Sequence, residues 1–161
     1  MHAQAPAALL EIDFQQWIVD LANDHTVIAR ARQLRDVLRT QGSDVYCLRY
    51  LDPAPGPRAD PTSREAAFVD TLKPGPRDIV LSKHGKDAFE NPDLHANLQG
   101  HGTTHLILTG LLTDHGVALT AKSAHALGYH VTVEENACAT TTKQAHHQAL
   151  RQLRQHGIAV V

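Results

Sequence analysis

The segment that decides the fold covers residues 105–121 and reads His105-Leu-Ile-Leu-Thr-Gly-Leu-Leu-Thr-Asp-His-Gly-Val-Ala-Leu-Thr-Ala121. Its first half is an apolar run typical of a buried strand, and a Gly/Thr turn then leads into a helical pattern. In an open α/β protein such a turn lies at the carboxyl edge of the sheet, beside a helix N-terminus. The segment therefore predicts an α/β architecture with a site at this turn.

Strand and helix patterns also alternate along the rest of the chain. We predict further strands and helices from apolar runs and from helical spacing, respectively. The predicted strands cover Ala7–Ile12, Asp44–Tyr50, Asp78–Ser82, Thr104–Thr109, Tyr129–Glu134 and Ile158–Val161. The predicted helices cover Val27–Thr40, Asn91–Gln99, Asp114–Leu127 and Thr142–His156.

These strands are almost continuously apolar, which is typical of a parallel sheet covered by helices on both faces. We therefore predict a three-layer αβα sandwich of the α/β class, with a mostly parallel, roughly six-stranded, Rossmann-like sheet. One domain is expected over residues 1–161. Between the second and third strands, Leu51–Arg77 carries six of the eight prolines and is predicted to be a long surface excursion.

The composition argues against several classes of protein. A net charge of −2 over 161 residues predicts no dominant attraction to nucleic acid or to an anionic membrane. No apolar run reaches the length that spans a bilayer, and the first residues lack the pattern of a secretory signal. The two cysteines, Cys47 and Cys138, provide neither a disulfide framework nor zinc-ligand spacing. We expect a cytoplasmic protein.

Three chemically useful groups follow predicted strands. Asp13 ends the first strand, Lys83 follows the third, and Thr113–Gly116 follow the fourth. Because the carboxyl ends of parallel strands share one edge of the sheet, we expect these groups to converge. A carboxylate beside an ammonium is a common arrangement for a charged, oriented general acid or base.

The chain resembles the isochorismatase-like hydrolase family, a group of cysteine hydrolases, over nearly its whole length. The resemblance rests on five regions in order, namely Leu9–Gln15, the second-strand region with Arg35, Gly42 and Val45–Tyr50, then Ile79–Phe89, Leu108–Val117 and His146–Gly157. It implies that Asp13 is a general acid or base and that Lys83 is its charged partner. It also implies a homo-oligomer, since members of the family commonly assemble.

One position departs from the family pattern. Where the family has its nucleophilic cysteine, this chain has Gly116, so thioester chemistry cannot proceed there. The true isochorismatases also tend to carry glycine at this position, and they hydrolyse a vinyl ether with an acid and a water molecule.

Our first hypothesis is a hydrolase of a small carboxylated metabolite that works without a cysteine. The alternative is an inactive member that binds a metabolite or a protein partner. A third interpretation is that Gly116 replaces a native cysteine.

Further residues are expected to bind substrate at the same edge, namely Leu112, Thr113 and His115 in the turn, and Phe14 and Trp17 after the first strand. Thr113 has the alternative role of helix N-cap, and Phe14 and Trp17 that of ordinary packing. His115 is a candidate for a substitute general base, because a histidine side chain can take up a proton near neutral pH.

We expect neither a metal nor a cofactor. The nicotinamidases of the family hold a metal with histidines after the second strand, and Leu51–Asp60 contains none. His146 and His147 are adjacent on a predicted helix and are expected to point to different faces.

Overall fold

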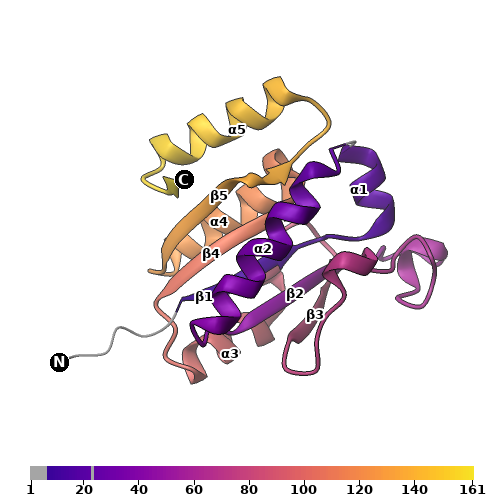
Figure 1. Ribbon diagram of the computed structural model, residues 1–161, viewed down its shortest axis with the longest axis horizontal. Helices are drawn as coiled ribbons and strands as arrows, with labels where there is room; N and C mark the ends of the chain where they lie inside the picture. Colours follow the sequence, from indigo (N-terminus) through magenta and orange to yellow (C-terminus); the bar gives the residue numbers. More distant parts are fainter. Residues whose placement is uncertain (1–6, 23) are drawn as a thin grey trace.

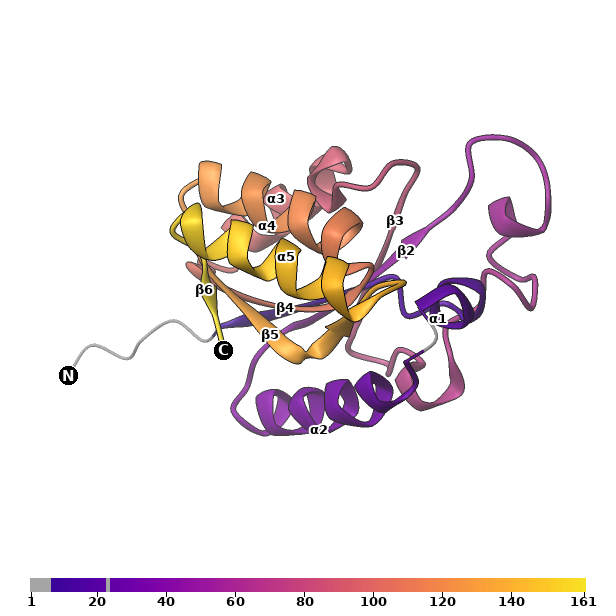
Figure 2. The ribbon, with the colours of Figure 1, turned by 90° about the horizontal axis from the view of Figure 1, so that it is seen from above.

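The computed structural model describes residues 7–22 and 24–161, which form a parallel sheet between two layers of helices (Figures 1 and 2). All five strand pairings are parallel, and the strand order is β3-β2-β1-β4-β5-β6. The predicted α/β sandwich with about six strands is therefore confirmed. The strands are β1 (Ala8–Ile12), β2 (Val45–Tyr50), β3 (Ile79–Lys83), β4 (His105–Leu111), β5 (His130–Ala139) and β6 (Ala159–Val160).

Helices cover both faces of the sheet. Helix α2 lies on one face, while α3, α4 and α5 lie on the other (Figure 2). The helix bounds are α1 (Gln16–Ala22), α2 (Thr26–Thr40), α3 (Pro92–Gly100), α4 (Ala118–Ala126) and α5 (Lys143–Gln155). No helix within the described residues has the length and apolar character needed to cross a bilayer.

Alternate residues of the central strands pack into two separate cores. Leu10 of β1 packs with Leu150 of α5 on one face, whereas the adjacent Leu9 packs with Leu38 of α2 on the other. All five residues of β1 are buried. Strands buried on both faces explain the continuous apolar runs in the sequence, because neither face is available for polar side chains.

The structure adds one helix to the predicted elements and corrects two of them. Helix α1 was not predicted, because its seven residues are too few to display a helical period. Strand β5 extends beyond Glu134 because it contains a bulge, in which residues 134–137 lie opposite Thr109 alone. The helix predicted from Asp114 begins as a π-helical turn, η4 (Thr113–Val117), before α4 starts.

The excursion over residues 51–77 has no strand and only two short 3₁₀ turns, η1 (Pro57–Ala59) and η2 (Asp70–Leu72). The buried side-chain amide of Gln15 attaches the middle of the excursion to the sheet, since Nε2 donates to the carbonyls of Tyr50 in β2 and of Ala66 in the excursion at 2.8 and 2.9 Å. The excursion is thus held against the carboxyl edge of the sheet rather than projecting freely.

The buried guanidinium of Arg35 on α2 joins the last part of the excursion to the sheet. It donates to the carbonyls of Leu72 and Lys73 at 2.8 and 2.9 Å. Its Nε also donates to Glu11 of β1 at 2.8 Å, and both charged side chains are almost fully buried. Burial raises the pKa of the Glu11 carboxyl, and the Arg35 guanidinium opposes that rise.

Candidate active site

Asp13 leaves β1 in an unusual backbone conformation. Its φ of 58° is in the left-handed region, which aspartate tolerates better than most residues. The turn is stabilised by a hydrogen bond in which the backbone N–H of Gln15 donates to the backbone carbonyl of Asp13 at 2.7 Å. This turn places the carboxylate at the carboxyl edge of the sheet, next to the ends of β3 and β4.

Asp13 and Lys83 form a buried ion pair, as the sequence predicted. Lys83 Nζ donates to Asp13 Oδ2 at 2.8 Å and to the Gly85 carbonyl at 3.2 Å. Asp13 is 5% exposed and Lys83 is 2% exposed. Burial raises the pKa of the Asp13 carboxyl to about 6, although the Lys83 charge and hydrogen bond act in the opposite direction.

The second carboxylate oxygen of Asp13 is available for chemistry. Oδ1 is buried and has no hydrogen-bond partner among the described residues. Because a buried oxygen without a partner is costly, such atoms often mark a place where a ligand or water binds. A carboxyl group with a pKa near 6 and one free oxygen is suited to proton transfer near neutral pH.

The turn after β4 carries Gly116. The peptide between Leu111 and Leu112 is cis, and η4 follows it, with the Val117 amide donating to the Leu112 carbonyl at 3.2 Å. A Cβ atom at Gly116 would lie 3.3 Å from Ile12 Cγ2, from the Leu111 carbonyl oxygen and from that of Lys86. The backbone is therefore packed closely around the glycine.

This packing predicts the effect of adding a single methyl group. Gly116→Ala is expected to destabilise the protein by about 1–3 kcal/mol, because two of the three crowded neighbours are backbone carbonyls that cannot rotate away. Thermal unfolding should show a fall of several degrees in Tm. Gly100→Ala is the matched control, since nothing lies within 4 Å of its added Cβ. A Tm of Gly116→Ala at or above that of the wild type would contradict the prediction.

A pocket of about 440 Å³ opens over these groups. Its lining contains six of the eight predicted site residues, namely Asp13, Lys83, Gly116, Leu112, His115 and Trp17. The structure therefore places at one pocket residues that come from the ends of three strands and from α1.

The other two predicted residues are buried away from this pocket. Phe14 packs in a core cluster with Ile18 and Val19 of α1. Thr113 is fully buried, and its Oγ1 lies 2.7 Å from His146 Nδ1 on α5. The turn at Asp13 directs Phe14 beneath α1, and η4 directs Thr113 toward α5, so direct substrate binding by these side chains is not supported.

The rim of the pocket includes residues that sequence reasoning did not assign to it. Lys86 Nζ lies 2.9 Å from His115 Nδ1, and both residues line the pocket together with Tyr50 and Asp52. Beside it, the Arg58 guanidinium lies 4.1 Å from the centroid of the Trp17 ring. The sequence feature that could have predicted Lys86 at the pocket is its position three residues after Lys83, in the same turn.

A larger hollow of about 1050 Å³ lies at the opposite, amino-terminal edge of the sheet. Three histidines line it, namely His105, His125 and His130, but no carboxylate, amine or thiol does. Of these two hollows, the smaller is the better candidate because its lining contains the buried ion pair of Asp13 and Lys83.

Neither cysteine supplies the missing thiol. Cys47 and Cys138 are both buried, and neither lines the pocket. Burial raises the pKa of the Cys138 thiol to about 12, so it stays protonated at neutral pH.

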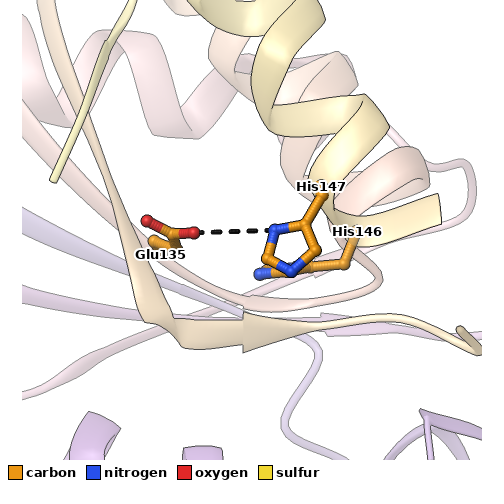
Figure 3. Close-up of side chains that lie close together, drawn as sticks. All are labelled: Glu135, His146 and His147. Carbon is orange, nitrogen blue, oxygen red and sulfur yellow. Dashed lines mark ion pairs between the residues drawn. The ribbon is translucent and has the colours of Figure 1, made fainter. Parts of the chain in front are cut away.

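The expectation that His146 and His147 point to different faces is wrong. Their ring centroids are 5.2 Å apart, and both side chains lie near Glu135 (Figure 3). Their position in the first turn of α5, next to the bulge of β5, brings both rings to the same carboxylate. Burial lowers the pKa of the His146 imidazole, and the neighbouring His147 lowers it further.

Comparison with known proteins decides the family. Residues 7–161 match the model of the Isochorismatase domain. The chain belongs to the isochorismatase family. The isochorismatase family protein YddQ of Bacillus subtilis is 30% identical over 145 residues, which cover 85% of this chain and 79% of YddQ. A streptothricin hydrolase of Streptomyces noursei is 35% identical over 137 residues, covering 83% of this chain and 49% of that enzyme.

The fold has close structural neighbours in the same family. An isochorismatase family protein from Desulfovibrio vulgaris superimposes with a TM-score of 0.92 at 22% identity, covering 98% of this chain and 94% of that protein. At this identity the likeness supports the fold alone. The match to the family model places the chain among isochorismatase-like hydrolases, without identifying its substrate.

Proposed function

We propose that this chain is a hydrolase that uses Asp13, and no thiol, to cleave the vinyl ether of a small carboxylated metabolite. The observation that carries the proposal is the free, buried Oδ1 of Asp13, whose other oxygen is held by Lys83. A protonated carboxyl in this position can donate a proton directly into the pocket. The absence of a side chain at Gly116 is compatible with this chemistry, because vinyl ether hydrolysis needs no covalent intermediate.

The reaction balances with one water molecule. Asp13 gives its proton to the terminal carbon of the vinyl group, and the resulting oxocarbenium ion takes up water at the carbon that carries the ether oxygen. The Asp13 carboxylate then recovers a proton from that water. The hemiketal breaks its carbon–oxygen bond, its hydroxyl proton passes to the leaving oxygen, and a ketone and an alcohol are released. Lys83 keeps the carboxylate oriented throughout.

Positive charge at the rim supports an anionic substrate. Lys86 and His115 are paired at the mouth of the pocket, which also carries the Asp52 carboxylate, and the Lys86 ammonium is the group there that attracts a substrate carboxylate. The ion pair of Asp13 with Lys83 lies deeper, so a substrate carboxylate at the rim would place the rest of a small molecule against the acid.

Pyruvate release from isochorismate tests the proposal directly. We expect turnover to depend on the protonated form of Asp13, whose pKa is raised to about 6. The value of kcat/KM should therefore be highest below pH 6 and fall about tenfold per pH unit above it. A rate that stays level between pH 5 and pH 8 would contradict the assignment of Asp13 as the acid.

The alternative is a family member that binds a metabolite without converting it. The lack of a nucleophile at Gly116 is the observation that favours it. A carboxylated ligand that raises the Tm and is recovered unchanged after long incubation would support binding alone. Measured product release would exclude this alternative.

A further inference from the structure

Three potential metal ligands gather outside the pocket of Asp13. Glu135, His146 and His147 each offer one ligand atom, and these atoms all lie within 4.8 Å of one another (Figure 3). Glu135 and His146 are half-buried, and His147 is exposed. Zinc binds imidazole nitrogen and carboxylate oxygen at about 2.0–2.2 Å, so small side-chain rotations would bring all three atoms to one ion.

The fold brings these residues together from two separate elements. Glu135 lies in the bulge of β5, and its amide donates to the Val161 carbonyl at 2.7 Å. The two histidines lie in the first turn of α5, whose start is set by Thr142 Oγ1 accepting from the Ala145 amide at 3.1 Å. The bulge and the helix start therefore determine the cluster.

His146 and Glu135 each have two possible ligand atoms. In each side chain a neighbouring residue contacts one of the two atoms, and the second atom remains for an ion. His146 Nδ1 is hydrogen-bonded to Thr113 Oγ1 at 2.7 Å, so Nε2 is the ring nitrogen that remains for an ion. Arg154 Nη2 lies 3.7 Å from Glu135 Oε2, while Oε1 faces His147 Nδ1 at the same distance. Supporting contacts of this kind orient metal ligands and select the histidine tautomer.

We propose that Glu135, His146 and His147 bind a single divalent transition-metal ion of the zinc type. Two imidazoles and one carboxylate suit zinc and its neighbours in the first transition row, whereas calcium and magnesium prefer oxygen ligands alone. All three residues line a cavity of about 560 Å³, which leaves room for water or another external ligand on the ion. This site is separate from the pocket of Asp13 and does not depend on the function proposed for it.

The ion would also have an effect on the turn that carries Gly116. A metal on His146 Nε2 requires the ring proton to be on Nδ1, where it donates to Thr113 Oγ1. Thr113 is the first residue of η4, so metal binding would hold one hydrogen bond to this turn in a single orientation.

Calorimetric titration of the full chain with Zn²⁺, free of any histidine tag, tests the site. We expect one ion per chain, and an affinity at least about tenfold weaker in each of His147→Gln and Glu135→Gln. His156→Gln is the matched control, because this exposed histidine follows the same helix and is not part of the cluster. Equal Zn²⁺ affinity in all four proteins, or no stoichiometric binding by the wild type, would overturn the proposal.

Histidine tautomers provide a second, independent measurement. Long-range ¹H–¹⁵N spectra of the wild type should show that added Zn²⁺ fixes His146 in the tautomer with its proton on Nδ1. In Glu135→Gln the same spectral change should need a Zn²⁺ concentration at least about tenfold higher. Zinc-dependent changes confined to other histidines would overturn the proposal. Thermal unfolding without metal checks that each variant is folded.

Discussion

Replacement of Asp13 with asparagine is expected to lower kcat/KM for vinyl ether hydrolysis by about 10²- to 10⁴-fold, the usual contribution of a general acid. Asparagine retains the size of the side chain but has no acidic proton to donate. Pyruvate release from isochorismate measures the loss. Asp20→Asn is the matched control, because it makes the same chemical change at an exposed position of α1. Turnover of Asp13→Asn within a few-fold of the control would contradict the proposed role.

Asp13 is part of a buried ion pair, so its replacement also affects stability. Variants of Lys83 separate this effect from the loss of the acid. Asp13→Asn leaves the Lys83 ammonium buried without its partner, which is destabilising in itself. The double variant Asp13→Asn/Lys83→Met removes both charges and should regain stability while remaining inactive.

In Lys83→Met alone, loss of the positive charge should raise the pKa of Asp13 further, so the fall in kcat/KM should occur at a higher pH than in the wild type.

Arg35→Met is expected to reduce the free energy of unfolding by about 3–5 kcal/mol, because it leaves the Glu11 carboxylate buried without a partner. It also removes the hydrogen bonds to the carbonyls of Leu72 and Lys73 that close the excursion. Urea unfolding monitored by circular dichroism measures the change.

Two further variants make this prediction specific. Arg32→Met removes an exposed arginine from the same helix, whose ion pair with Asp36 and hydrogen bond to the Thr71 carbonyl should together contribute at most about 2 kcal/mol. Glu11→Leu/Arg35→Met removes both buried charges and should be more stable than Arg35→Met alone. If Arg35→Met and Arg32→Met unfold at the same urea concentration, the buried pair does not stabilise the fold.

Much of the fold was predictable because local patterns and tertiary packing agree. The apolar runs at β1 and β4 and the helical spacing of α2 each match a buried strand or face in the structure. The prediction was wrong where packing overrides local pattern. Strand β5 continues past Glu134 because its bulge restores pairing at Cys138, and a bulge has no period that a sequence window detects.

The residue types, their order and the positions where strands end are properties of the sequence alone. They were sufficient to predict a parallel sheet and the meeting of Asp13, Lys83 and Gly116 at its carboxyl edge, because every parallel strand ends at the same edge. Side-chain direction was decided only by the tertiary structure. Phe14 and Thr113 are adjacent to site residues in sequence yet turn away from the pocket, and Glu135 meets two histidines of a different element. Such contacts depend on backbone turns and on packing between distant segments, which no local pattern records.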